Sequence, residues 1–155
     1  MKSIAYPALG LLFAATAQVA LAPRMSVFGA RPDLLLVAVT LLSMNRSSDA
    51  AAVIGFFAGL LHGGVANTKM AAFVISRILG GIAGSIVGRT TMAATALTVT
   101  ASSLATTGIA SFAYLLLGVP KDLFGWALAT FGTLLYNTVL VVGIFWLFGR
   151  RRGRV

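Results

Sequence analysis

Residues 55–63 read GFFAGLLHG and residues 80–88 read GGIAGSIVG, and both stretches repeat glycine at every fourth position. This spacing places the glycines along one side of a helix. In lipid, such a row lets two helix backbones approach closely and gain dispersion contacts, which the hydrophobic effect cannot supply there. We therefore interpret these glycines as a helix-packing surface, either within this chain or toward a partner: Gly55, Gly59, Gly63, Gly80, Gly84 and Gly88.

The composition of the chain is typical of a membrane protein. Of its 155 residues, 59% are hydrophobic and only 10% are charged, whereas about a quarter of the residues in a soluble domain are charged. Apolar runs separated by short polar breaks fill most of the chain, and this pattern predicts an all-α, polytopic membrane bundle. There is no cysteine, so neither a disulfide framework nor a thiolate metal site is expected.

The apolar runs predict a single transmembrane domain, residues 1–155, with about six helices. The second predicted helix spans about 22 Å at 1.5 Å per residue, less than a hydrocarbon core of about 30 Å, so it is expected to be tilted or only partly inserted. The first apolar run is interpreted as a retained helix, because Pro23 directly after Ala22 fits a signal-peptide cleavage site poorly. The predicted helices are residues 4–22, 32–46, 50–65, 70–88, 92–118 and 123–148, and residues 149–155 form a basic tail.

The basic residues indicate the orientation of the bundle. The formal net charge is +9, and four arginines (Arg150, Arg151, Arg152 and Arg154) follow the last apolar run. Such a tail is typical of a cytoplasmic end that contacts anionic lipid headgroups, and nucleic acid is not an expected partner. With six crossings, the positive-inside bias places both termini in the cytoplasm. If the short second segment does not cross, the N-terminus lies outside, and the tail alone still indicates a cytoplasmic C-terminus.

Arg77 is a charged residue near the middle of the fourth predicted helix. A charge at that depth costs a few kcal/mol or more, so it needs a partner or a wet cavity. Candidate partners are Asp33, Asp49, backbone carbonyls or a group on another protein. Two interpretations stay open: Arg77 is a clamp between helices or subunits, or it snorkels or pairs locally.

The sequence offers little for catalysis. One histidine, His62, and three acidic residues do not form a convincing metal set. Serine, histidine and carboxylate show no recognisable motif spacing, and no phosphate-binding loop is present. We therefore expect no enzymatic activity, no cofactor and no catalytic or metal-binding residue. His62 is expected to form a hydrogen bond at a helix end, and Asn137 and Gln18 are expected to join helices.

Three segments together resemble the rod shape-determining protein MreD family. They are RPDLLL at residues 31–36, GFFAGLLH at residues 55–62 and Asn137 in the last helix. The family has a similar RPD/N-LLL helix start, a GF-xxG-LL-D helix end at a similar distance and a late asparagine. The resemblance covers nearly the whole chain and makes Arg31, Pro32, Asp33 and Asn137 structural motif residues. His62 departs from the pattern, because the family usually has an aspartate there.

The resemblance implies a non-enzymatic scaffold subunit in the bacterial cytoplasmic (inner) membrane. Proteins of this family associate with MreC and, through it, with MreB, RodA and a penicillin-binding transpeptidase, in the machinery that elongates the cell wall. Their fold is similar to that of the substrate-binding subunits of vitamin transporters. On this hypothesis one of the two glycine rows is a close-contact face for the partner, and Asp33 and Asn137 help to order the bundle.

The shared fold leaves a second hypothesis open, in which the chain is the substrate-binding subunit of a small-solute, vitamin-type transporter. That function requires a polar pocket open to the exterior with several placed polar side chains. Recovery of ATPase and coupling subunits, or of a stoichiometric small molecule, would distinguish it from the scaffold.

Overall fold

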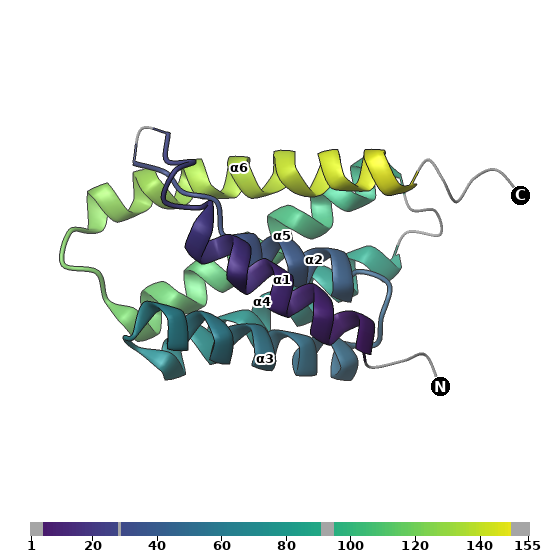
Figure 1. The fold of residues 1–155 in the computed structure, drawn as a ribbon, viewed down its shortest axis with the longest axis horizontal. Coiled ribbons are helices and arrows are strands. Elements are labelled where there is room, and N and C mark those ends of the chain that lie inside the picture. Colours follow the sequence, from purple (N-terminus) through teal and green to yellow (C-terminus); the bar gives the residue numbers. More distant parts are fainter. Residues whose placement is uncertain (1–4, 28, 91–94, 150–155) are drawn as a thin grey trace, which may run out of the picture.

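The computed structural model describes residues 5–27, 29–90 and 95–149. Residues 150–155, which hold the four arginines of the predicted basic tail, lie outside the described residues. The described residues form six helices and no named strand, with an isolated bridge between Val27 and Ala30. The helices are α1 (Ala5–Ala20), α2 (Leu34–Ser43), α3 (Ser48–Ala66), α4 (Met70–Thr90), α5 (Ala96–Gly118) and α6 (Leu123–Gly149) (Figure 1).

Polar side chains cap three of these helices and fix where they begin. The Asp33 carboxylate accepts the Leu36 N–H at the start of α2, and Ser47 and Thr95 cap α3 and α5 in the same way. These caps explain why α3 begins before the predicted residue 50 and α5 after the predicted residue 92. Residues 92–94 of that prediction lie outside the described part of the chain.

Four helices of the described chain are long and apolar enough to cross a membrane: α3, α4, α5 and α6. The other two are shorter, with 16 residues in α1 and 10 in α2. At 1.5 Å per residue α2 is only about 15 Å long. The chain is therefore an all-helical protein with several potential membrane-crossing helices.

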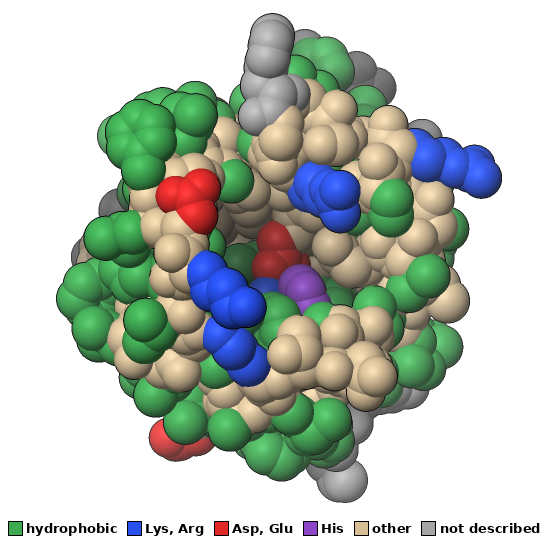
Figure 2. Space-filling view, turned by 90° about the vertical axis from the view of Figure 1, so that its left-hand side faces the viewer, with side chains coloured by type: hydrophobic (Ala, Val, Ile, Leu, Met, Phe, Trp, Pro, Cys, Tyr) green, Lys and Arg blue, Asp and Glu red, His purple; other side chains and the backbone are tan. Residues whose placement is uncertain are grey.

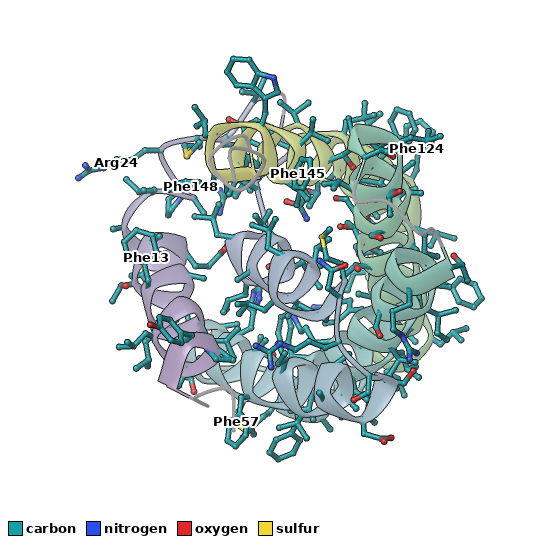
Figure 3. The ribbon with its side chains drawn as sticks, turned by 90° about the vertical axis from the view of Figure 1, so that its right-hand side faces the viewer. Phe13, Arg24, Phe57, Phe124, Phe145 and Phe148 are labelled. Atoms are coloured by element: carbon teal, nitrogen blue, oxygen red, sulfur yellow. The ribbon has the colours of Figure 1, made fainter. Side chains whose placement is uncertain are left out.

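The shortest helix, α2, occupies the centre of the bundle. Figure 3 shows it surrounded by the other five helices. Leu35 and Val39 on α2 are completely buried, and α1 and α3 cover them with Leu11, Ile54 and Ala58. This position explains why a helix too short to cross a bilayer is among the most apolar segments of the chain.

Both glycine rows pack helices of this chain against each other. A Cβ added at Gly55, Gly59 or Gly63 would lie within 3 Å of the backbone of α4. A Cβ at Gly80 or Gly84 would meet Thr106 on α5 at a similarly short distance, and one at Gly88 would meet Met44 after α2. Backbones this close leave no space for a side chain. Of the two predicted roles, the structure places the six glycines in internal helix packing, not at a free partner surface.

A glycine that the four-residue spacing did not single out has the same function. Gly81 lies one position after Gly80, so it faces a different side of α4. A Cβ there would lie 2.8 Å from the Ala51 carbonyl oxygen on α3. The pair Gly80-Gly81 thus allows α4 to contact α5 and α3 at the same level.

The connections gather at the two ends of the bundle. Figure 1 shows the start of α1 and the end of α6 at one end, where the chain also passes from α2 to α3. The opposite end, called here the loop end, carries the α1–α2, α3–α4 and α5–α6 connections. These three connections contain residues 24, 31, 69 and 121, all of which are basic.

Candidate functional site

The candidate site is built around Asp33, the residue at which α2 begins inside the bundle. Its neighbours come from helices far apart in the sequence: His62 from α3, Arg77 from α4 and Asn137 from α6. The sequence had singled out all four residues separately, and the structure brings them together.

A buried ion pair lies at the centre of the site. Arg77 Nη2 is 2.5 Å from Asp33 Oδ2, and the two side chains are 4% and 13% exposed. Of the partners considered for Arg77, the structure therefore selects Asp33, whereas Asp49 lies in the first turn of α3. Mutual neutralisation and hydrogen bonding make such a pair tolerable in a low-dielectric interior. The pair joins α4 to the start of α2, so it clamps helices within this chain.

His62 completes the charged cluster. Its Nδ1 lies 2.8 Å from Arg77 Nη2 and 3.5 Å from Asp33 Oδ1. A guanidinium can only donate, so Nδ1 accepts from Arg77, and the assigned tautomer carries its hydrogen on Nε2. The Nε2–H has no hydrogen-bond partner among the described residues.

Aromatic rings hold the other side of the cluster. Phe73, one helical turn before Arg77, stacks on the His62 ring with centroids 4.4 Å apart and planes 13° apart. The Arg77 guanidinium lies 4.6 Å from the Phe73 centroid, within cation–π distance. Tyr114 on α5 is tilted against Phe73 at 5.0 Å. Phe73 and Tyr114 were not predicted, because ordinary core aromatics at these positions give the same sequence signal.

Amides from two other helices satisfy the backbone at the start of α2. The Asp33 N–H donates to Asn137 Oδ1 at 2.9 Å, and the Leu34 N–H donates to Gln18 Oε1 at 2.6 Å. Asn137 Nδ2 also approaches Thr107 Oγ1 at 3.4 Å. The first N–H groups of a helix have no partner within the helix, so a start inside a bundle needs acceptors such as these amide oxygens. Asn137 and Gln18 thus join helices, and they do so through the backbone of α2.

A cavity of about 230 Å³ lies beside the cluster. Figure 2, which shows the loop end, has a hollow with acidic and histidine side chains at its floor and basic side chains around its opening. The cavity exists because α2 begins part-way into the bundle and leaves the space toward the loop end unfilled. Its lining includes Asp33, His62 and Arg77, the aromatic residues Phe73, Tyr114 and Trp126, and the hydroxyl residues Ser111, Thr130 and Thr133.

The polar groups that line the cavity include donors, hydroxyl groups and one carboxylate. The Asp33 carboxylate already accepts from Arg77 and from the Leu36 N–H. Trp126 Nε1 is a donor only, and hydroxyl groups can donate or accept. Among the described residues, no group of three or more His, Cys, Asp or Glu side chains is placed to hold a metal ion. The geometry therefore suits the binding of a polar group.

Comparisons of the chain with protein-family models, with curated proteins and with solved structures gave no match.

Proposed function

We propose that this chain is a non-enzymatic scaffold subunit of the bacterial cell-wall elongation machinery, similar to MreD. One observation carries the proposal: the three segments on which the resemblance rests meet at one point. Asp33 of the first segment bonds to Asn137 of the third through its N–H and lies 3.5 Å from His62 of the second. These contacts span up to 104 residues of sequence, which supports treating the three short motifs as parts of one structural unit.

The chemistry of the cluster agrees with a scaffold. The Asp33–Arg77 pair is neutral as a whole, and its atoms are used to hold α2 against α4. In the MreD pattern an aspartate stands at position 62. Here Arg77 supplies a positive charge that pairs with the Asp33 carboxylate, and His62 Nδ1 accepts a hydrogen bond from Arg77. The departure at His62 is thus compensated by its neighbours.

The proposal includes a six-crossing arrangement in the bacterial cytoplasmic membrane, with a fold similar to the vitamin-transporter subunits. In it, α1 forms one crossing, and α2 with the preceding connection forms another. At the end of the bundle that holds the start of α1 and the end of α6, the α2–α3 connection contains Arg46 and the last turn of α4 contains Arg89. In the sequence, Lys2 precedes α1 and four arginines follow α6, so six crossings assign seven basic residues to the side of the termini and four to the other side, which supports cytoplasmic termini. The tail would contact anionic headgroups there.

We propose that MreC binds the outer face of α6, and that MreB, RodA and a penicillin-binding transpeptidase join through it. The glycine rows are already occupied by α3, α4 and α5, so another surface must receive the partner. Helix α6 is the longest span and the least buried of the four. An apolar stripe at helical spacing runs along it and is 50–81% exposed: Phe124, Leu128, Phe131, Leu135 and Val139.

The test is affinity purification of the full chain from native membranes, with mass spectrometry of the recovered proteins. We expect MreC with RodA and its transpeptidase. Replacing Phe131 and Leu135 with alanine should reduce MreC recovery several-fold, while the matched replacement of Leu9 and Phe13, exposed on α1, should leave it unchanged. Equal recovery from both variants would refute the α6 surface, and absence of MreC would refute the scaffold.

A second candidate function is the substrate-binding subunit of a small-solute transporter. The cavity favours it, because the cavity is polar, lined by aromatic rings and open at the loop end. In the same purification, recovery of ATPase and coupling subunits in place of MreC would establish this alternative.

A further inference from the structure

We propose that the cavity beside Asp33 is a binding site for a small aromatic carboxylate. This inference goes beyond the scaffold function, which needs no ligand, and it concerns the chain on its own. It rests on the size of the cavity, the direction of its hydrogen-bonding groups and the charge around its opening.

The volume limits the ligand to a small molecule. Pockets for drug-sized ligands usually measure about 300–1,000 Å³, and this cavity measures about 230 Å³. A single ring or a fused pair with a short substituent is the size class that fits. Phe73, Tyr114 and Trp126 contribute flat apolar walls, and such walls favour an aromatic ring through offset or edge-to-face contacts.

The polar groups of the cavity favour a ligand that accepts hydrogen bonds. Among the described residues, His62 Nε2–H and Trp126 Nε1–H have no hydrogen-bond partner, and both can only donate. The Thr133 hydroxyl already donates to the Arg31 carbonyl at 2.9 Å. The carboxylate of Asp33 is engaged by Arg77 and Leu36. A ligand carboxylate would supply the acceptors that these donors lack, and charge-assisted hydrogen bonds are stronger than neutral ones.

The Nε–H of Arg77, deep in the site, also lacks a hydrogen-bond acceptor among the described residues. Arg77 is only 4% exposed, and its Nε is a buried atom. Buried donors of this kind carry a free-energy penalty of about 1–3 kcal/mol. A polar ligand group or an ordered water in the cavity would relieve it.

The opening favours an anion over a cation. The three connections of the loop end carry Arg24, Arg31, Lys69 and Lys121 against one acidic residue at their surface, Asp122. The Asp33–Arg77 pair at the floor adds no net charge. Lys69 bonds to the Gly118 carbonyl and ties two of these connections together. A cleft with one sign of charge at its mouth raises the local concentration of the opposite ion.

Binding can be measured with benzoate, benzamide and benzylamine, which share one ring and differ in charge. The protein is the full chain in lipid nanodiscs, with Trp146→Phe so that Trp126 is the remaining tryptophan. We expect a saturable change of Trp126 emission with benzoate, with a Kd of about 1 mM or tighter. Benzamide and benzylamine should bind at least about tenfold more weakly, a difference of about 1.4 kcal/mol.

Variants locate the site. His62→Phe keeps a ring against Phe73 and removes the Nε2–H, so benzoate affinity should fall at least tenfold. Lys121→Gln should weaken binding a few-fold at low salt, and Arg89→Gln at the opposite end should have no effect. Equilibrium dialysis of labelled benzoate on protein that elutes as a single folded species provides a second readout.

The inference is overturned if folded wild-type protein shows no saturable binding by either method. Benzamide binding as tightly as benzoate would refute the carboxylate, and unchanged affinity in His62→Phe would refute the location. Recovery of MreC from membranes is measured separately, so failure of this inference and failure of the scaffold proposal remain distinguishable.

Discussion

Helices α4 and α6 are both long, apolar spans, and they differ in how they meet the rest of the protein. In the most apolar window of α4, 44% of the residues are buried, against 11% in α6. Helix α4 contacts its neighbours through glycines, with backbone against backbone. Helix α6 is held by a few side chains, among them the fully buried Asn137 and Val141. Similar hydrophobicity therefore serves two purposes: α4 is the packing centre, and α6 presents a surface.

Between these two long spans, the small residues and not the overall hydrophobicity distinguish the packed helix from the exposed one. In lipid, burying a leucine between helices gains little because lipid tails are equally apolar. Close backbone approach and interhelical hydrogen bonds supply the stability.

Gly59→Leu should abolish the folded protein. A Cβ at Gly59 would lie within 3 Å of Phe73 and Val74 backbone atoms, and overpacking against backbone costs about 1–3 kcal/mol or more. The control is Gly64→Leu on the same helix. Outside the neighbouring backbone of α3, no described atom lies within 4 Å of a Cβ built at Gly64. Helicity and size-exclusion homogeneity after purification are the measurements. Equal yields of folded protein from both variants would contradict the packing assigned to α3 and α4.

Arg77→Met should lower the free energy of unfolding by about 3–5 kcal/mol, because it leaves a buried carboxylate without its counter-ion. The double variant Arg77→Met with Asp33→Asn should lose less, since the uncompensated charge is gone. Unfolding in mixed micelles, followed by circular dichroism, measures both. A double variant no more stable than Arg77→Met would show that the pair acts through packing and not through charge.

Asn137→Ala should cost about 1–2 kcal/mol, because the Asp33 N–H loses its acceptor inside the bundle. The matched control on α6 is Val139→Ala, since Val139 is 71% exposed. The same unfolding experiment applies. If the control loses as much stability as Asn137→Ala, then α6 is held by its outer face and the contrast with α4 fails.

Gly143→Ala on α6 should change stability by less than about 0.5 kcal/mol or raise it slightly, since alanine is the better helix former. Outside the neighbouring backbone of α6, no described atom lies within 4 Å of a Cβ built at Gly143. Gly84→Ala on α4 is the matched glycine, and it should lose about 1–3 kcal/mol against Ser102 and Thr106. Thermal unfolding of the two variants gives the sharpest single comparison of the helices.

Much of the fold was predictable from local patterns. Apolar runs located the helices approximately, whereas Asp33 was predicted to lie inside the second helix and is its N-cap in the structure. The boundaries of α2 were predicted too widely, as 32–46 instead of Leu34–Ser43. The reason is that Pro32 and Asp33 are residue types that also suit a first helical turn, and only the cap geometry shows that Asp33 precedes the helix and that Met44 follows it.

The site was predictable only as separate residues. Asp33, His62, Arg77 and Asn137 each stood out as polar groups in apolar surroundings, but their meeting depends on packing between helices. The aromatic walls of the cavity could not be predicted from the sequence, because residues such as Tyr114 and Trp126 are common at core and interfacial positions of any membrane helix. Gly81 was missed for a similar reason, since its neighbour Gly80 alone fits the four-residue spacing.

The sequence by itself determined the class of protein, the approximate helices and the residues small enough for close packing, because these follow from composition and from a periodicity of a few residues. Tertiary structure alone decided that both glycine rows face inward, that Arg77 selects Asp33 across 44 residues, and that α2 begins inside the bundle. The cavity follows from that last fact. A pattern along one helix states which side is small or polar, but it contains no information on which other helix will lie against it.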